Sequence, residues 1–140
     1  MNASTTIKIQ IPSHPRYCDV ARMAVTGIAS DAGFSELDVE DIKMAVSEAC
    51  INVIQHAYDE DLHPLFLTFT YDDSKMIITI ADEGKGFDTE KIKANAKPIS
   101  PESPKTSGLG LFIIQNLMDD VQILSIEGQG SSMQLTKNKK

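Results

Sequence analysis

Residues 36–57 carry a long helical repeat with a defined start. Apolar residues recur there at steps of three and four, the spacing of one face of an α-helix, at Ile42, Val46, Ala49, Val53 and Ala57. The stretch SELD before the repeat is typical of a capping box, with Ser35 as N-cap and Asp38 as third helical residue. Phe34 and Val39 have the spacing of a hydrophobic staple. The segment predicts a helix that begins near Glu36 and buries one stripe.

A line of polar residues follows one flank of that stripe. Glu48, Asn52 and His56 have the spacing i, i+4 and i+8, which places them on the same side of a helix. They therefore lie where the helix meets the elements on which it packs. We expect them to border the core and not to face bulk water.

Alternation of polar with β-branched or other apolar residues predicts strands elsewhere in the chain, at residues 5–11, 65–71, 75–82, 121–127 and 131–137. Pro12 is expected to end the first strand, and the short turns at residues 72–74 and 128–130 predict two hairpins. Further helices are expected over about residues 15–32, with Gly33 as a left-handed cap, and over residues 111–121 after the glycines of SGLGL.

The connection over residues 83–107 has no periodicity, and a segment that long is either a functional lid or a disordered loop. The element order is then β-α-α-β-β-lid-α-β-β. It predicts an α/β fold of the α+β sandwich type, with a mixed, mostly antiparallel sheet and helices on one face. Such a layer arrangement leaves room for a ligand between the helices and the sheet.

Composition limits the class of protein. The chain has 140 residues, of which 41% are hydrophobic and 24% charged, which suits one globular domain over residues 1–140. No signal peptide and no apolar run of about 20 residues is present, so we expect a cytoplasmic protein that does not enter a membrane. A net charge of −7 argues against direct nucleic-acid binding. Cys18 and Cys50 are expected to be reduced, packed thiols.

Three short motifs carry candidate chemistry, although each also has an ordinary structural explanation. Glu48 and Asn52 form ExxxN on the predicted helix, and a helix flank often carries solvated polar residues. DEGKGF begins with Asp82 at the end of a strand, and Asp and Gly are common turn residues. SGLGL opens a helix, whose N-terminal N–H groups and dipole suit phosphate oxygens.

Together and in this order, the motifs resemble the N, G1 and G2 boxes of the GHKL superfamily of ATPases and kinases. The longer segments KMAVSEACINVIQHAY, IADEGKGFD and SGLGLFIIQNLMDDV resemble the bacterial anti-sigma-factor serine kinases. The resemblance implies a GHKL or Bergerat-type ATP-binding fold with a lid over the nucleotide. It also implies a protein-serine kinase that binds a sigma factor and phosphorylates a small anti-anti-sigma partner of the STAS type.

The resemblance assigns roles to the polar line. Glu48 is the implied general base that takes a proton from the attacking serine hydroxyl. Asn52 is implied to hold Mg²⁺ through its carbonyl oxygen, and magnesium accepts few protein ligands beside phosphate and water oxygens. His56 is implied to lie near the phosphates or the lid. The implied cofactors are therefore ATP and Mg²⁺.

The glycine motifs receive roles in nucleotide binding. Asp82 resembles the aspartate that accepts a hydrogen bond from the adenine amine, and Ser131 matches a position near it where relatives often have Thr. Gly84 and Gly86 let the backbone approach the nucleotide closely. Gly108 and Gly110 are implied to close on the β- and γ-phosphates, and Ser107 and Leu109 beside them are implied to bind ATP.

One position departs from some family members, which carry Arg just before SG where this chain has Thr106, preceded by Lys105. A homodimer is also implied by the resemblance. Two alternatives stay open. The first is a binding module that uses ATP without phosphoryl transfer, against which Glu48 argues. The second is a detached ATPase domain of a histidine kinase, against which the missing phosphoacceptor helix argues.

Overall fold

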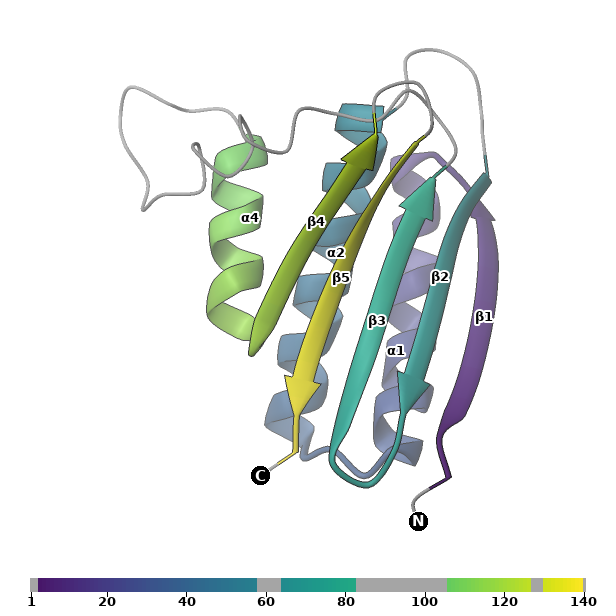
Figure 1. Ribbon diagram of the computed structural model, residues 1–140, viewed down its shortest axis with the longest axis vertical. Coiled ribbons are helices and arrows are strands. Elements are labelled where there is room, and N and C mark those ends of the chain that lie inside the picture. Colours follow the sequence, from purple (N-terminus) through teal and green to yellow (C-terminus); the bar gives the residue numbers. More distant parts are fainter. Residues whose placement is uncertain (1–2, 58–63, 83–105, 127–129, 140) are drawn as a thin grey trace.

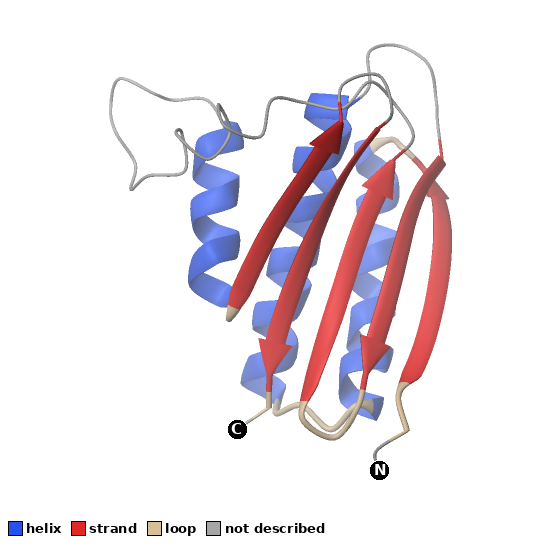
Figure 2. Cartoon of the chain, viewed as in Figure 1, coloured by secondary structure: helices blue, strands red, loops and turns tan. Residues whose placement is uncertain are grey.

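The computed structural model describes residues 3–57, 64–82, 106–126 and 130–139. The elements in chain order are β1 (Thr5–Pro12), the 3₁₀ turn η1 (Pro15–Tyr17), α1 (Cys18–Asp31), α2 (Glu36–Ala57), β2 (Pro64–Tyr71), β3 (Lys75–Asp82), α4 (Thr106–Leu117), β4 (Asp120–Ile126) and β5 (Gly130–Asn138). Every predicted helix and strand is found (Figure 2). Most of residues 83–107, the predicted lid, lie outside the described residues.

The five described strands form one sheet in the order β1-β2-β3-β5-β4. All four pairings among them are antiparallel, so the α+β class is confirmed and the expected mixed character is wrong. The reason lies in the connections. Parallel neighbours need a crossover, but β2 to β3 and β4 to β5 are joined by short links, and the two hairpins meet along β3 and β5.

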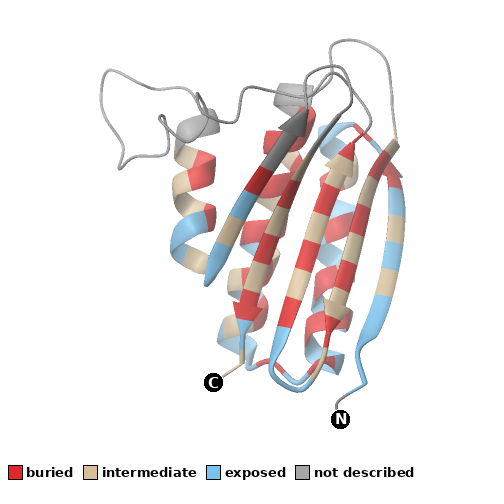
Figure 3. Ribbon diagram, in the orientation of Figure 1, coloured by how far each residue is buried: buried red, intermediate tan, exposed pale blue. Residues whose placement is uncertain are grey.

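Helices α1, α2 and α4 cover one face of this sheet, as predicted (Figure 1). Successive strand residues alternate between buried and partly exposed, as Figure 3 shows most clearly in β2 and β3. The buried set, which includes Phe69, Ile78 and Leu135, meets the apolar stripe of α2 in a single core. The layer arrangement is therefore two deep, with α2 in the centre of the helical layer.

The predicted start and stripe of α2 are confirmed. The Asp38 backbone N–H donates to the Ser35 hydroxyl oxygen at 3.2 Å, which is the N-cap bond of a capping box. Phe34 and Val39 are both buried, as a hydrophobic staple requires. The stripe residues from Ile42 to Val53 have no exposed surface. The side chain of Ala57 lies outside the described residues.

Helix α1 begins later than predicted, because residues 15–17 form a separate 3₁₀ turn and the α-helix starts at Cys18. Gly33 has φ +95°, the left-handed conformation predicted for the cap. Cys18 and Cys50 are both buried free thiols. A hydrogen bond with Cys50 lowers the pKa of Cys18, and the same bond together with burial raises the pKa of Cys50 well above its usual value.

The strand ends also differ in detail. Pro12 is the last residue of β1 and pairs with Pro64, and as an edge-strand residue it needs no N–H for the ladder. The hairpin between β2 and β3 is held by Asp72, whose carboxylate accepts from the Ser74 N–H at 2.7 Å and the Lys75 N–H at 3.0 Å. These bonds, together with one from the Ser74 hydroxyl, lower the pKa of Asp72.

Helix α4 occupies Thr106–Leu117, so it starts and ends earlier than the predicted 111–121. The glycines of SGLGL lie inside its first two turns and do not precede it. The helix ends because Asp119 bonds to β5, where its N–H donates to the Thr136 carbonyl at 2.8 Å. No helix in the described part of the chain is long and apolar enough to span a membrane.

Candidate functional site

The polar line on α2 borders the core, as predicted for its first two members. Glu48 is half-buried, and Asn52 is buried with 4% of its surface exposed. Both project from the helix beside the apolar stripe because they are one turn apart on the same flank. His56 belongs to α2, but its side chain lies outside the described residues.

The amide of Asn52 has one satisfied and one unsatisfied end. Its Nδ2 donates to the Glu48 backbone carbonyl at 2.9 Å, which fixes the orientation of the group. Its Oδ1 is buried and has no hydrogen-bond partner among the described residues. A buried polar atom without a partner is costly, and a bound cation would satisfy it. A carbonyl-type oxygen is a ligand that Mg²⁺ accepts, so this atom fits the predicted magnesium role.

Helix α4 approaches these two residues through Gly110. A Cβ atom built on Gly110 would lie 2.6 Å from Asn52 Nδ2 and 3.1 Å from Glu48 Oε2. Glycine allows this approach without strain, whereas a Cβ here would force the Asn52 amide or the helix to shift, because real Cβ atoms essentially never come so close. The structure thus brings three predicted site residues together: Glu48, Asn52 and Gly110.

A second pair of predicted residues meets in the sheet. Asp82 is the last residue of β3, and the register places it directly opposite Ser131 of β5. Asp82 is on the helix-facing side, with 5% of its surface exposed. The side chain of Ser131 lies outside the described residues. A buried carboxylate at a strand end, beside a serine position, agrees with the predicted contact to adenine.

The cluster of Glu48, Asn52 and Gly110 and the pair of Asp82 and Ser131 belong to the same end of the molecule. Helix α2 and strand β3 end there, and α4 begins there (Figure 1). Ser107, Gly108 and Leu109 are in the first turns of α4, together with Thr106, its first residue. Gly84, Gly86 and Lys105 lie outside the described residues.

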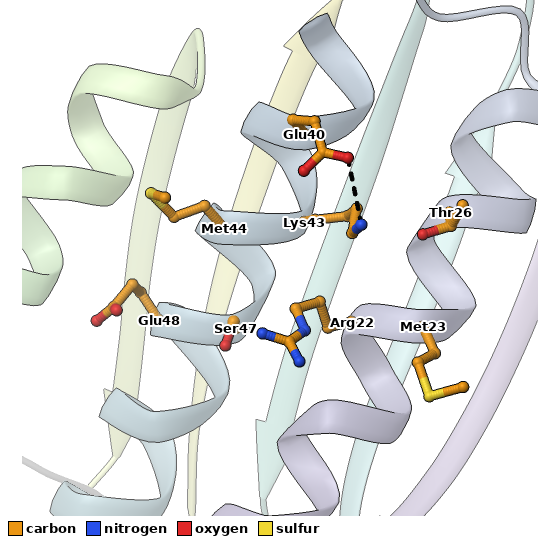
Figure 4. A pocket seen from close by; sticks show the side chains of 8 residues that line it. All are labelled: Arg22, Met23, Thr26, Glu40, Lys43, Met44, Ser47 and Glu48. Carbon is orange, nitrogen blue, oxygen red and sulfur yellow. Dashed lines mark hydrogen bonds and ion pairs between the residues drawn. The ribbon is translucent and has the colours of Figure 1, made fainter. Parts of the chain in front are cut away.

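A pocket of about 470 Å³ lies between α1 and α2 on the side away from the sheet. Figure 4 shows the side chains that line it, with Arg22 reaching from α1 toward Ser47 of α2. Of the predicted site residues, Glu48 alone lines this pocket. Glu48 therefore lies at the edge of the pocket, and its Oε2 is on the Gly110 side of α2.

Sequence reasoning did not select the other residues of this pocket. Met23 and Met44 line it and are exposed, although each belongs to an otherwise amphipathic helix. Met44 falls outside the apolar stripe of α2, so a large apolar residue at a position predicted to be solvated was an available signal. Lys43 forms an ion pair with Glu40 at 3.3 Å at the rim.

Comparison with known proteins identifies the family. Residues 11–137 match the histidine kinase-like ATPase domain family. The serine-protein kinase RsbW of Bacillus thuringiensis (strain Al Hakam) is 38% identical over 126 residues, which cover 87% of this chain and 79% of the relative. The chain belongs to the RsbW family of serine-protein kinases. RsbW of Bacillus cereus (strain AH187) is 37% identical over the same share of each chain.

A solved structure supports the fold of this RsbW-family chain. The crystal structure of the RsbU and RsbW domains of Rv1364c from Mycobacterium tuberculosis superposes with a TM-score of 0.69 at 17% identity. The match covers 95% of this chain but 32% of that one, so this chain spans about a third of the solved protein's length. At this identity the likeness shows the fold alone.

Replacing Gly110 with Ala is expected to weaken binding of ATP in the presence of Mg²⁺. The added methyl group would displace the Asn52 amide, and overpacking of this kind costs about 1–3 kcal/mol. Isothermal calorimetry measures the effect. The matched control is Gly27→Ala in α1, because a Cβ at Gly27 has nothing within 4 Å. Equal affinities for the two variants would contradict the role given to Gly110.

Proposed function

We propose that this chain is an ATP-dependent protein-serine kinase that also sequesters a sigma factor. The observation that carries the proposal is the buried, unpartnered Oδ1 of Asn52, on a side chain one helical turn from Glu48 whose amide Nδ2 faces Gly110. Serine phosphorylation needs an oxygen that binds the metal, a general base and a helix start that binds phosphate. The names of the RsbW relatives support the same reaction.

Nucleotide recognition is assigned to Asp82. A carboxylate is an acceptor only, so it pairs with the exocyclic amine of adenine and opposes the carbonyl that guanine has there. Preference for ATP over GTP follows from this chemistry. The start of α4 contributes backbone N–H groups and the positive end of its dipole to the phosphates.

Glu48 is the proposed general base. The serine oxygen of the acceptor attacks the γ-phosphorus of ATP, its proton passes to the Glu48 carboxylate, and the bond from the γ-phosphorus to the bridging oxygen breaks to release ADP. Glu48 is half-buried and lines the pocket between α1 and α2, which gives an acceptor segment a route to it from solvent. A bound Mg²⁺, held by Asn52, supplies neutralisation of phosphate charge.

A kinase is favoured over a module that only binds ATP. Binding of ATP alone requires no carboxylate at the position of Glu48. A half-buried carboxylate beside a phosphate-binding helix start would even weaken binding, because it repels the phosphate charge. A histidine-kinase ATPase domain is the weaker alternative, since the relatives of this chain carry the name serine-protein kinase.

The proposed partners are a sigma factor and an anti-anti-sigma protein of the STAS type that carries the acceptor serine. Both follow from the family and from the reaction assigned to Glu48. A sigma factor is part of the transcription machinery, so the proposed place of action is the cytoplasm. Direct nucleic-acid binding forms no part of the proposal, because the chain has a net charge of −7.

A homodimer through the uncovered face of the sheet is also proposed. Phe66 and Ile77 contribute apolar surface there, among many threonines. The charged side chains at described positions of this face are Lys8, Lys75 and Asp120, a net +1 in a chain of net −7. Two copies that meet through this face therefore bring together few charges, in a chain that is otherwise strongly negative. We expect sedimentation equilibrium to give twice the monomer mass of 15.3 kDa, and Phe66→Glu to give the monomer.

The kinase assignment is tested by a transfer assay. Proteins from the native organism that bind the purified chain with ATP or ADP present are identified, purified and incubated with it, ATP and Mg²⁺. Phosphoserine on one of them, detected by mass spectrometry, is the expected result. Tight ATP binding without phosphoserine on any captured protein would instead support the binding module.

A further inference from the structure

Lys137 of β5 is a buried lysine, with 9% of its surface exposed. Its Nζ donates to the carbonyl of Leu117, the last residue of α4, at 2.6 Å. The carbonyls at a helix C-terminus lack partners within the helix, and the dipole is negative there. The ammonium group of Lys137 is therefore a cap on the C-terminal end of α4.

Thr136 and Asn138, on either side of Lys137, bond to Asp119, just after the C-terminal end of α4. The Asp119 N–H donates to the Thr136 carbonyl at 2.8 Å, and the Asp119 carboxylate accepts from the Asn138 N–H at 2.6 Å. Three consecutive residues of β5 thus fix the point where α4 passes into β4. Lys137 differs from its neighbours because it holds the helix itself.

The same ammonium group connects α4 to the start of α2. Asp38 and Asp41 of α2 approach Lys137 Nζ at 3.9 and 3.8 Å. Asp38 is mostly buried and lies in the first turn of α2, so screening by solvent is limited on that side. Lys137 thereby links the sheet, the first turns of α2 and the last turn of α4.

The N-terminal half of α4 contacts the candidate site through Gly110. Gly110 lies about two helical turns before Leu117 and approaches Asn52 without an intervening side chain. A helix is stiff over this length. A shift of its C-terminal end therefore changes the distance between Gly110 and the Asn52 amide.

We propose that Lys137 is a positioning residue for nucleotide binding, which acts through α4 on the contact between Gly110 and Asn52. This inference rests on the proposed function, since it gives the residues at the start of α4 their phosphate-binding role. The role is positioning because Lys137 contacts Leu117, Asp38 and Asp41 and not the candidate site residues Glu48, Asn52 or Gly110. Its effect is specific because Asn52 is the proposed magnesium ligand: loss of the cap should reduce the gain in ATP affinity that Mg²⁺ provides.

The test is calorimetric titration of ATP, with and without Mg²⁺, into wild type, Lys137→Met and Lys137→Arg. Lys137→Met is expected to weaken Mg²⁺-dependent ATP binding at least about fivefold, the lower limit of typical coupling between linked sites. Lys137→Arg keeps the charge and should restore most of the affinity. The control is Lys139→Met, which removes an ammonium group that lies over the Phe34 ring, away from α4.

The outcomes separate the two levels of inference. A wild-type chain that does not bind ATP contradicts the proposed function. The positioning role alone is overturned if the wild-type chain binds ATP and folded Lys137→Met binds it equally well. In that case Mg²⁺ also gives both proteins the same gain in ATP affinity. If Lys137→Met does not fold, Lys137→Gln removes the charge at the same position and keeps a polar end, with the same expected loss. Unchanged binding and an unchanged Mg²⁺ gain in Lys137→Gln then overturn the proposal.

Discussion

A protein with Glu48→Gln is expected to form phosphoserine on its acceptor about 10²- to 10⁴-fold more slowly than wild type, the usual contribution of a general base. Glutamine has the shape of glutamate, so it fits the same space opposite Gly110. It cannot take the proton of the serine hydroxyl. Binding of ATP and of a sigma factor should continue, because neither depends on that proton.

Single-turnover transfer from ATP to the purified acceptor, with ATP affinity measured separately, checks this result. Glu36→Gln is the matched control, since it makes the same change at the exposed first residue of α2. Transfer at the wild-type rate by Glu48→Gln would show that Glu48 is not the base, and the mechanism proposed above would then be wrong.

Asn52→Leu is expected to abolish Mg²⁺-dependent phosphorylation without destabilising the ligand-free protein. Loss of a metal that neutralises phosphate charge removes several kcal/mol of transition-state stabilisation, which is more than about 10²-fold in rate. The unpartnered Oδ1 of Asn52 costs about 1–3 kcal/mol in the ligand-free state, and Leu replaces it with an apolar group of similar size. Stability should therefore stay level or rise while activity is lost.

Thermal unfolding without ligand, and transfer rates across a range of Mg²⁺ concentrations, measure the two effects. The control is Asn116→Leu on α4, where the side chain makes the same bond to a carbonyl four residues earlier, at 2.7 Å, but is exposed. That variant should keep its Mg²⁺ dependence. A large fall in the unfolding temperature of Asn52→Leu would mean that the Asn52 amide stabilises the fold and does not serve metal binding.

Features that depend on neighbouring residues were predictable from the sequence. The Ser35 cap, the stripe of α2 and the left-handed Gly33 each follow from residues within two turns, and all three are confirmed. The placement of Glu48 and Asn52 at the border of the core follows from the same helical period. The roles of Glu48 and Asn52 stay predictions. The unpartnered Oδ1 of Asn52 supports the metal-binding role, and the sequence pattern did not reveal it.

Features that depend on residues far apart in the chain were not predictable. Helix α4 was expected to continue through Asp119 because the residues up to it are helix-compatible, but the partner that ends the helix is Thr136 in a later strand. For Lys137 the sequence held part of the answer, because the alternation puts it in step with Met133 and Leu135 on the buried face. Its partners were not predictable, since Leu117 and Asp38 become its neighbours only after the sheet has formed.

The position of β5 between β3 and β4 has a consequence for how the protein matures during synthesis. Strands β1, β2 and β3 pair in sequence order and can assemble while the chain is still emerging from the ribosome, N-terminal part first. Among the described strands β4 pairs with β5 alone, and Asp82 gains its neighbour Ser131 from β5 as well. Nascent chains that stop before β5 thus lack both of these pairings, and the adenine site proposed at Asp82 is complete only once β5 has docked. If Asp82 has its proposed role, the capacity to bind ATP is acquired at the last step of assembly.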